Sequence, residues 1–355
     1  MSVTPILSGS TNQPPVPVNA LQISVVIPTY NRRESLLRAL RALTRQTFPA
    51  GHFEVIVVSD GSTDGTKEAV QALQTPYQLT FVEQSNSGPS VARNRGAELA
   101  QAPLLVYMDD DIEPVPGFLQ EHASAHAGVE DLVLIGPQSE PPDESAPHWI
   151  AWEHRMLQRQ YDNFVNGVWR AGPNNLYSGN FSVRREHLLA VGGFDVRFTR
   201  QEDVELGFRL AQRGLRFDFN PRAIGYHRPT RPFASWYRTP FEYGRRDVQM
   251  ARELGEERAM ELARRHFRER NLLTQWLARM TTGVPILEEV PLLIGRAAVR
   301  WGGRRVALVA CSLLFNLRYL QGMCRELGGR RQLWKALRQV HRDGATGRET
   351  GGVET

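Results

Sequence analysis

The chain has 355 residues, of which 41% are hydrophobic and 23% are charged, and its formal net charge is +5. This composition is typical of a globular protein with a catalytic domain and an accessory region, and it excludes collagen-like and strongly charged disordered chains. The basic excess lies between residues 241 and 345, which contain twenty Arg or Lys against eleven Asp or Glu. The two cysteines, Cys311 and Cys324, match no metal-binding spacing and suit a reducing compartment.

The first half of the chain alternates between short apolar runs and amphipathic segments. Residues 1–21 are rich in Ser, Thr, Asn and Pro, and we predict a flexible tail there, not a signal peptide. Apolar, β-branched runs predict strands at 22–30, 52–60, 78–84 and 103–111. Helical spacing predicts helices at 32–45, 67–73 and 88–102. This alternation indicates an α/β fold whose mostly parallel, Rossmann-like sheet has helices on both faces.

Regular patterning stops after Gly136, where a Pro-rich stretch precedes an aromatic segment at 148–177. A strand with a short helix is predicted at 175–194, a helix at 201–214, and two short strands within 215–227. From about residue 236 the pattern is helical and rich in arginine. We therefore divide the chain into a tail (1–21), a catalytic domain (22–235), a basic helical region (236–345) and a disordered tail (346–355).

Three consecutive aspartates, Asp109, Asp110 and Asp111, end the fourth predicted strand. Adjacent carboxylates repel one another, so a cation is expected there. Mg²⁺ and Mn²⁺ prefer carboxylate oxygens and often share them with substrate phosphates. Strand alternation would point Asp109 and Asp111 the same way and Asp110 the other way. A solvated acidic loop is the alternative, but the buried strand before the triplet favours a metal site.

Other polar residues also follow predicted strands, at Thr29, Asp60 and Gln84. In such sheets ligands bind beyond the carboxyl ends of the strands, so these residues should converge on one crevice with the aspartates. Asp60 suits a carboxylate that accepts hydrogen bonds from a ribose or a base. Asp64, in the turn that follows, is better interpreted as a structural turn and cap residue.

Four further residues carry charge toward the same end of the sheet. Arg93 and Arg95 could pair with a diphosphate; a solvated helix face explains Arg93 equally well and Arg95 less well. Glu202 and Asp203 start a predicted helix, where carboxylates are stabilised by the helix dipole. One of them could instead be a general base, and the sequence does not choose between these roles.

His227 follows a predicted short strand, and it is interpreted either as a ligand of the same metal or as a packed histidine. The dinucleotide-binding and P-loop glycine motifs are absent from the sequence.

Six segments in a fixed order carry a family resemblance: VVIPTYNR, VIVVSDGSTDGT, NSGPSVARNRG, VYMDDDIEP, SGNFSVRREHLLAVGGFD and QEDVELGFRLAQRG. Over about residues 22–230 the chain resembles the inverting family-two glycosyltransferases of the GT-A fold. The resemblance implies a Mn²⁺- or Mg²⁺-dependent enzyme that transfers a sugar from a nucleotide-diphosphate donor, with UDP favoured. The acceptor hydroxyl would belong to a glycan, a glycolipid or a small molecule.

The resemblance also implies roles for individual residues. The donor-binding set would be Pro28, Thr29 and Tyr30 around the base, Asp60 at the uracil or ribose, Arg95 near the nucleotide, Asn180 facing the sugar, and Asp110. The metal ligands would be Asp109 and Asp111, the D-x-D pair, with His227. Asp203 would be the catalytic base, next to Glu202. The Q-x-x-R-W signature of processive synthases is absent, and AQRGLRF stands in its place, so we predict transfer of a single sugar.

The C-terminal region lies outside the resemblance. The apolar run 306–315 is too short to predict a membrane span, and Arg296, Arg300, Arg304 and Arg305 lie close to it. Two roles stay open: an interfacial helix on an anionic membrane, or a helical subdomain packed against the catalytic domain or a homodimer partner. We expect a cytoplasmic protein, with the inner face of the cell membrane and a lipid-linked acceptor kept open.

Two other functions are kept as alternatives. A metal-dependent nucleotidyltransferase would use a similar sheet, but it would not need a base for a sugar hydroxyl. A non-catalytic protein that binds through its basic tail would leave the acidic crevice without a purpose. No nucleic-acid partner is expected, because carboxylates repel phosphates unless a cation intervenes.

Overall fold

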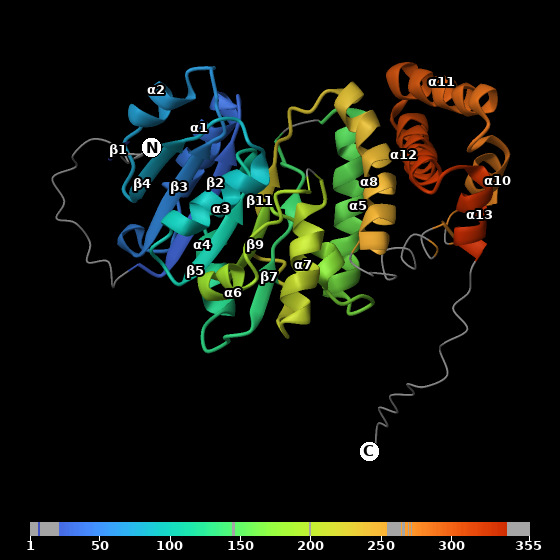
Figure 1. The fold of residues 1–355 in the computed structure, drawn as a ribbon. Coiled ribbons are helices and arrows are strands. Elements are labelled where there is room, and N and C mark those ends of the chain that lie inside the picture. Colours follow the sequence, from blue (N-terminus) through green and yellow to red (C-terminus); the bar gives the residue numbers. More distant parts are fainter. Residues whose placement is uncertain are drawn as a thin grey trace. The chain divides into compact units, whose positions relative to one another are not determined.

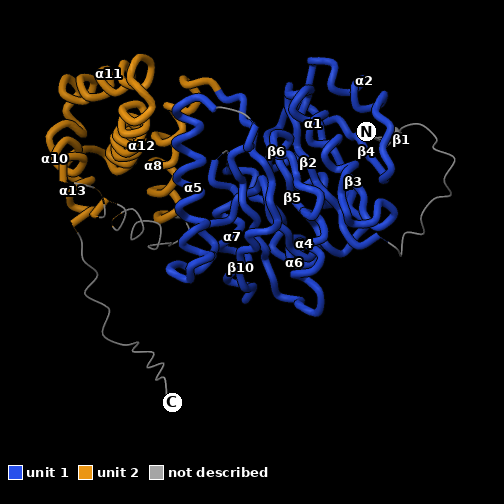
Figure 2. The backbone as a smooth tube through the Cα atoms, turned by 180° about the vertical axis from the view of Figure 1, so that it is seen from behind, with its two compact units in different colours: residues 1–231 blue, residues 232–355 orange. Residues whose placement is uncertain are grey.

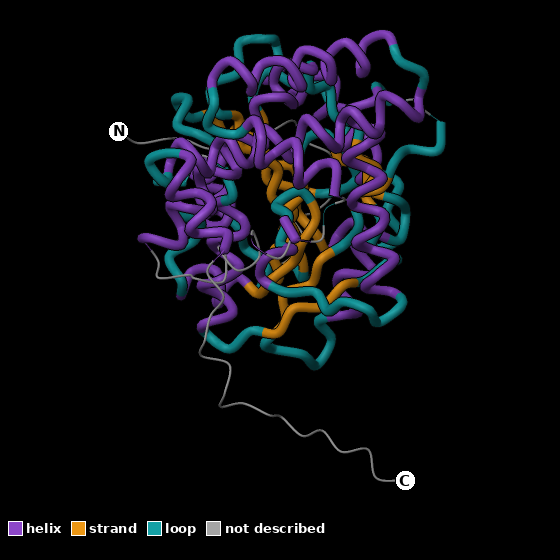
Figure 3. Tube along the Cα trace, turned by 90° about the vertical axis from the view of Figure 1, so that its right-hand side faces the viewer, coloured by secondary structure: helices purple, strands orange, loops and turns teal. Residues whose placement is uncertain are grey.

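The computed structural model describes residues 6–7, 21–143, 146–198, 200–253, 264, 267–268, 270 and 272–338. The chain divides into two compact units, Met1–Arg231 and Pro232–Thr355, coloured separately in Figure 2. All strands of the described chain belong to the first unit, whereas the described parts of the second unit are helical (Figure 3). The predicted tail at 346–355 lies outside the described residues.

The first unit is built on an eight-stranded sheet with the order β1-β4-β3-β2-β5-β9-β7-β10 (Figure 1). Its strands are β1 (Ile6–Leu7), β2 (Ile23–Thr29), β3 (Phe53–Ser59), β4 (Gln78–Glu83), β5 (Leu104–Met108), β7 (Leu132–Ile135), β9 (Asn180–Arg184) and β10 (Arg216–Phe219). Strands β4, β3, β2 and β5 are parallel to one another, and β9 is antiparallel to β5 and β7. The predicted α/β class with a mostly parallel sheet is therefore confirmed.

A second sheet of three strands has the order β6-β11-β8. Its strands are β6 (Ile112–Pro114), β8 (Gln138–Ser139) and β11 (Gly225–His227). In the antiparallel pairing of β11 with β6, His227 lies opposite Ile112. This register places His227 next to Asp111, although the two residues are far apart in sequence.

Helices cover both faces of the main sheet. The first unit contains α1 (Arg33–Leu43), α2 (Thr66–Gln71), α3 (Pro89–Leu99), α4 (Phe118–Ala125), α5 (His148–Val165), α6 (Arg185–Ala190) and α7 (Glu202–Gln212), with short 3₁₀ turns η2 (Ala50–His52) and η3 (Pro173–Asn175). Leu36 of α1 and Phe118 of α4 pack with Val25 in one core cluster. Ala92 of α3 and Leu206 of α7 pack with Val26 in the other. Because Val25 and Val26 point to opposite faces of β2, the sheet lies between these two layers.

The predicted strands and helices before residue 100 are present, with ends that differ by a few residues. Within the predicted tail, Ile6–Leu7 form β1, which pairs with β4. One predicted boundary was wrong. The fourth strand ends at Met108, before the aspartates, because residues 109–111 turn the chain into β6.

The aromatic segment after residue 147 forms α5, an 18-residue helix that the sequence pattern did not show. Its buried positions include Ile150 and Tyr161 but also His154 and Trp152. A polar ring on the buried face weakens the apolar periodicity on which a helix prediction depends.

The second unit contains five helices in its described part: α8 (Phe233–Glu253), α10 (Leu272–Thr281), α11 (Pro285–Trp301), α12 (Arg304–Glu326) and α13 (Arg330–Arg338). Helix α12 is central and contacts α8, α10, α11 and α13. Glycines permit the closest approaches. A Cβ at Gly244 of α8 would lie 2.0 Å from the carbonyl oxygen of Tyr319, and one at Gly322 of α12 would lie 2.0 Å from that of Phe241.

We predict that Gly96→Ala destabilises the protein by about 1–3 kcal/mol, the usual cost of overpacking. A Cβ at Gly96 would lie 2.3 Å from Cγ1 of Val26, which is fully buried on β2. Helix α3 would therefore have to move away from the sheet. Urea denaturation followed by circular dichroism measures the effect. Gly117→Ala is the control: it has a φ of −85° and nothing within 4 Å, so it should change stability by less than about 0.5 kcal/mol. Equal effects of the two substitutions would contradict the close packing of α3.

Candidate active site at the carboxyl ends of the strands

The carboxyl ends of β2 and β5 lie together, and so do those of β3 and β4. The hydroxyl of Thr29, at the end of β2, donates to Asp110 Oδ2 over 2.7 Å. Gln84, after β4, donates to Asp60 Oδ1, after β3, over 2.8 Å. Thr29 is almost fully buried, whereas Tyr30 next to it is 48% exposed. Of the three residues expected at the base, Tyr30 therefore presents the most surface for stacking.

The three aspartates do not follow strand alternation, because β5 has ended before them. Asp110 and Asp111 are buried and share Nη1 of Arg32, at 3.1 and 2.9 Å. Asp109 pairs instead with Nη2 of Arg93 over 2.8 Å, and its side chain is 34% exposed. The triplet therefore separates into one accessible carboxylate and a buried pair that shares a cation.

Burial, and next the charge of Asp111, raise the pKa of Asp110 to about 7, against the opposing effects of Arg32 and of the hydrogen bond from Thr29. One guanidinium thus compensates the buried pair only in part. Arg32 itself was not among the predicted site residues. Its position three residues after the end of β2, at the sheet edge that carries the acidic triplet, is the signal that could have identified it.

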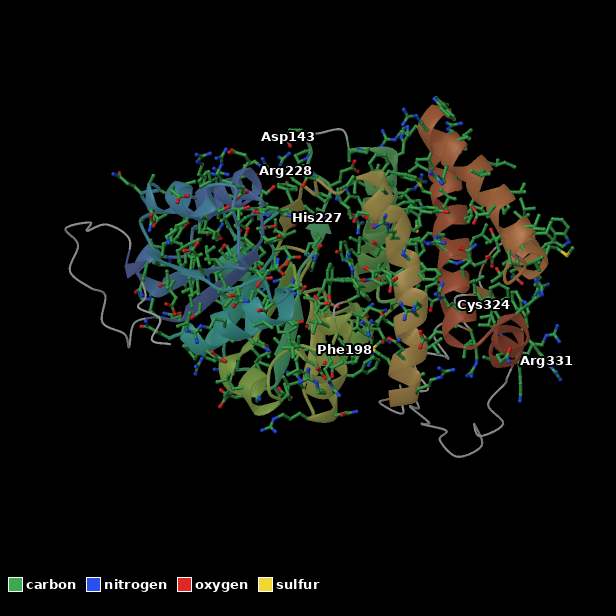
Figure 4. The ribbon with its side chains drawn as sticks, turned by 45° about the horizontal axis from the view of Figure 1, so that its top comes forward. Asp143, Phe198, His227, Arg228, Cys324 and Arg331 are labelled. Atoms are coloured by element: carbon green, nitrogen blue, oxygen red, sulfur yellow. The ribbon has the colours of Figure 1, made fainter. Side chains whose placement is uncertain are left out.

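His227 lies at the end of β11, with Nε2 at 3.6 Å from Asp111 Oδ1. Its buried Nδ1 has no hydrogen-bond partner in the described part of the chain. The ring packs edge-on against His154 of α5 at 5.6 Å, and burial lowers the pKa of His154 to about 4. Figure 4 shows His227 close to Arg228, whose Nη2 binds Asp143 over 2.6 Å. The structure therefore brings His227 to Asp111, as the metal-ligand prediction requires.

Arg93 joins the end of β5 to the start of α7. Its side chain is 5% exposed, with Nη2 on Asp109 and Nη1 on Glu202 Oε1 at 2.9 Å. Burial lowers the pKa of Arg93, but Asp109 and Glu202 outweigh burial, so its pKa lies above the ordinary value. We call Arg93, Asp109, Glu202 and Asp203 the Arg93 network.

Arg95, the arginine that the sequence favoured, lies on an exposed side of α3. It is 38% exposed and pairs with Glu98 over 3.2 Å, and the structure does not bring it to the Arg93 network. The signal that separates the two arginines is helical position. Arg93 shares the buried side of α3 with Ala92, Gly96 and Ala97, small residues that let the helix approach the sheet.

Glu202 and Asp203 have different environments at the start of α7. The residue before them, Gln201, has a φ of 58°, in the left-handed region that non-glycine residues seldom adopt. Asp203 Oδ2 accepts the backbone N–H of Ser178 over 3.2 Å. Burial, and next the charge of Glu202, raise the pKa of Asp203 to about 7. Glu202 is held by Arg93, whereas Asp203 has the basicity of a group that can accept a proton near neutral pH.

Asp60 is engaged by the chain itself. Besides Gln84, the backbone N–H groups of Ser87 and Gly88 donate to its carboxylate, both over 2.8 Å. These bonds hold the loop that leads into α3. Asp64 accepts the N–H of Arg33 at the first turn of α1 and the N–H of Thr66, which agrees with its interpretation as a structural residue.

Asn180 begins β9 opposite Met108, the last residue of β5, but its side-chain amide is used within the fold. It is fully buried, its amide donates to the carbonyls of Pro137 and Ala223, and His122 contacts its Oδ1 over 3.0 Å. Burial lowers the pKa of His122 to about 3, so the ring is neutral. All hydrogens of the Asn180 amide are used in packing β9, a position that differs from the one expected for a sugar-facing residue.

The carboxylates at this end of the sheet suit a divalent cation. Within the described ranges, no three His, Cys, Asp or Glu side chains are arranged as a ready metal site. Mg²⁺ and Mn²⁺ do not require one, because one or two carboxylates together with substrate phosphates suffice. The carboxylate of Asp109 is accessible, and Asp110 and Asp111 share a single guanidinium, that of Arg32. These oxygens and their excess negative charge suit such an ion.

Comparison with known proteins agrees with this geometry. The model of the family "Glycosyl transferase family 2" matches residues 24–191. The glycosyltransferase AglE of Haloferax volcanii is 30% identical over 234 residues, which cover 64% of this chain and 73% of that protein. Validoxylamine A glucosyltransferase of Streptomyces hygroscopicus is 33% identical over 63% of this chain, but the chain spans only 58% of that protein's length.

Solved structures share the fold. A mannosyltransferase of Pyrobaculum calidifontis, in complex with GDP-Man and Mn²⁺, has a TM-score of 0.57 at 19% identity and covers 84% of this chain and 86% of its own. TarS 1–349 of S. aureus, in complex with UDP-GlcNAc, has a TM-score of 0.54 at 19% identity and covers 87% of this chain and 93% of its own. The chain therefore belongs to glycosyl transferase family 2, and its class is that of the glycosyltransferases.

We predict that Arg93→Ala destabilises the protein by about 3–5 kcal/mol, because two carboxylates lose a buried partner. Arg93→Lys should restore part of this stability, since it keeps the charge but cannot span both carboxylates with a planar fork. Arg95→Ala is the matched control on the same helix and should cost less than about 1 kcal/mol. Thermal and urea unfolding of the three variants measure the difference. Similar losses for Arg93→Ala and Arg95→Ala would refute the central place of Arg93.

Proposed function

We propose that this protein is a metal-dependent, inverting glycosyltransferase that moves one sugar from a nucleoside-diphosphate sugar to an acceptor hydroxyl. The observation that carries the proposal is the Arg93 network. One buried arginine holds a carboxylate at the end of β5 and another at the start of α7, and Asp203 stands beside it. This arrangement supports a site where the carboxylate at the end of β5 lies near the diphosphate and Asp203 lies near the acceptor hydroxyl.

In this proposal the donor lies along the carboxyl ends of β2, β3 and β5. Pro28, Thr29 and Tyr30 border the base, where the half-exposed ring of Tyr30 offers a stacking surface. Asp60 approaches the base or the ribose, with the loop that it organises next to it.

Three further donor residues predicted from the sequence have different support. Asp110 supports the donor site indirectly, because it accepts hydrogen bonds from Thr29 and Arg32 and holds these two residues in place. Arg95 requires a ligand that reaches the outer side of α3, and Asn180 acts by packing β9 and not by contact with the sugar.

The diphosphate requires positive charge. Arg32 and Arg93 supply some positive charge, but each is already paired with two carboxylates. A cation is therefore needed in addition. Asp109 and Asp111, with His227, would hold Mn²⁺ or Mg²⁺. The bound ion would supply Lewis-acid stabilisation of the departing nucleoside diphosphate.

The acceptor hydroxyl requires a base. We assign this role to Asp203, whose pKa of about 7 allows it to accept the proton as the oxygen attacks the anomeric carbon. Attack from the side opposite the diphosphate breaks the bond to the leaving group in one displacement and inverts the anomeric centre. Glu202 takes part through Arg93 and by raising the basicity of Asp203.

The donor nucleotide is proposed from comparison. Of the similar proteins named above, one is a glucosyltransferase, and the two solved structures are complexes with GDP-Man and with UDP-GlcNAc. UDP-sugars are our first choice, with GDP- and dTDP-sugars next. The acceptor is a glycan, a glycolipid or a small molecule. Single transfer is proposed because the motif of processive synthases is absent from the sequence.

A donor screen tests the function directly. We expect nucleoside-diphosphate release from at least one UDP-, GDP- or dTDP-sugar, stimulated by Mn²⁺ or Mg²⁺ and lost with EDTA. Asp109→Asn should weaken this stimulation, while Asp218→Asn, an exposed aspartate on β10, should not. Failure to bind or hydrolyse any nucleotide sugar in the screen would reject the proposed function. Release that is unaffected by EDTA would reject the metal dependence alone.

For the active donor, Asp203→Asn should lower kcat by about 10²–10⁴-fold while donor affinity stays within a factor of about three, because only the proton acceptor is lost. Since Asp203 must be deprotonated to act, kcat/KM should rise with pH below about 7 and level off above it. Steady-state kinetics between pH 5 and 9 and donor titration by calorimetry measure the two effects. Loss of donor binding in the variant, or a flat pH profile in the wild type, would remove Asp203 from the role of base.

A further inference from the structure

Helix α11 has apolar residues on two opposite sides. Its inner side packs in the second unit, where Leu292 and Val299 are buried and a Cβ at Gly295 would lie 2.7 Å from Leu314 of α12. Its outer side exposes a row of large apolar side chains. We call this row the outer stripe: Ile286 (83% exposed), Val290 (53%), Leu293 (57%), Ile294 (66%) and Trp301 (77%). Spacings of three, four and seven residues place them on one side of the helix.

The exposure is concentrated in this part of the chain. Among the described residues, twelve of the eighteen exposed large hydrophobic side chains lie between positions 272 and 309, on α10, α11 and the first turns of α12. Val306 of α12 continues the surface, because its Cγ1 would lie 3.1 Å from a Cβ at Gly302, directly after Trp301. Large exposed apolar patches on soluble proteins generally mark interaction sites.

The charge around the outer stripe has one sign. Residues 290–325 contain six arginines and no Asp or Glu. Arg300, Arg304 and Arg305 are exposed and form no ion pair with any residue that the structure describes. The guanidinium of Arg300 lies 5.7 Å from the ring centre of Trp301. The apolar row ends in a tryptophan and three arginines without an acidic partner among the described residues. Such a row suits a partner that has an apolar interior beneath an anionic surface.

We propose that the outer stripe of α11 docks on an anionic lipid bilayer, with the helix lying in the plane of the membrane surface. The apolar side chains enter the acyl boundary, and Arg300, Arg304 and Arg305 bind headgroup phosphates. A second copy of the chain is the less suitable occupant. In a symmetric, antiparallel contact through this face, each copy would offer only two carboxylates of α11, Glu288 and Glu289, to the four arginines of its partner, Arg296, Arg300, Arg304 and Arg305.

For the segment 306–315 the sequence left two roles open, an interfacial helix or a packed helical subdomain, and the burial of this segment favours the packed role. Ala307, Ala310, Cys311 and Leu314 of that segment are buried in the second unit. Helix α12 is the one helix of the described chain that is long and apolar enough to cross a membrane, but 56% of its apolar window is buried. Helix α12 is therefore the core on which α11 is supported, and α11 presents the docking surface.

Vesicle co-sedimentation of the full chain at low salt tests the proposal. The probes are vesicles of phosphatidylcholine alone and of an equimolar mixture of phosphatidylcholine and phosphatidylglycerol. We expect binding to the mixed vesicles, at least tenfold stronger than to phosphatidylcholine alone and weakened by added salt. Neither donor nor acceptor is present, so the result is independent of the proposed glycosyl transfer.

Two double variants separate the contributions. Arg304→Glu with Arg305→Glu should weaken binding to the mixed vesicles by at least about twentyfold, since each arginine near an anionic surface contributes roughly a factor of five. Leu293→Ser with Ile294→Ser should reduce binding to the mixed vesicles at least about tenfold. It should also remove most of the binding that remains when salt is added. The matched controls lie in the first unit, at exposed positions: Arg41→Glu with Arg213→Glu, and Val165→Ser with Val168→Ser. Both controls should bind like the wild type.

Three results would overturn the proposal. The first is a wild-type protein that ignores the mixed vesicles at low salt. The second is vesicle binding that the control substitutions reduce as much as the α11 and α12 substitutions do. The third comes from analytical ultracentrifugation: a wild-type dimer that Leu293→Ser with Ile294→Ser converts to a monomer would assign the outer stripe to a second copy of the chain.

Discussion

The candidate site depends on one buried guanidinium. Arg93 has almost no contact with solvent, and it stays charged because Asp109 and Glu202 accept hydrogen bonds from its two terminal nitrogens. Removing a charge from water costs several kcal/mol, and only well-placed, hydrogen-bonded partners offset that cost. The same contacts bind the end of β5 to the start of α7, so the geometry of the site and the solvation of Arg93 depend on each other.

Around Arg93 the acids differ in environment and hence in chemistry. Glu202 is neutralised by an ion pair, whereas Asp203, next to it, is buried with weaker compensation and has a pKa near 7. Asp109 is accessible, while Asp110 and Asp111 are buried and share Arg32. Neighbouring carboxylates thus acquire separate properties from the elements that surround them, as general bases and metal ligands require. This division supports the assignment of metal binding and proton transfer to different residues.

The second unit has a different physical organisation. Its core forms where α12 meets α8 and α11, with glycines at the closest approaches, and it leaves a second apolar side on α11. A helix that is apolar on both sides requires two partners. Helix α12 is one of them, and the arginine-rich end of α11 suggests that the other is an anionic surface. The basic excess of the C-terminal region then has a local cause, because it accompanies an exposed apolar row.

The sequence by itself determined the strand–helix alternation of residues 22–102, the parallel sheet and the polar strand ends, because these depend on local periodicity and chain order. It also contained the ordered motifs that place the chain in its family. The sequence did not reveal α5, whose buried side contains His154 among apolar residues. It favoured Arg95 over Arg93, because two arginines two residues apart differ only in which side of α3 meets the sheet, and the sequence does not fix that side. It placed Asn180 at the sugar, whereas the folded chain uses its amide to pack β9.

Tertiary structure decided the partners of the aspartates as well. Strand alternation grouped Asp109 with Asp111, but β5 ends at Met108, and the turn that follows gives Asp109 to Arg93 and the other two to Arg32. His227 reaches Asp111 only through the pairing of β11 with β6. Local sequence sets which elements form. The ion pairs of a site join residues that are distant along the chain, so only the packing of those elements decides them.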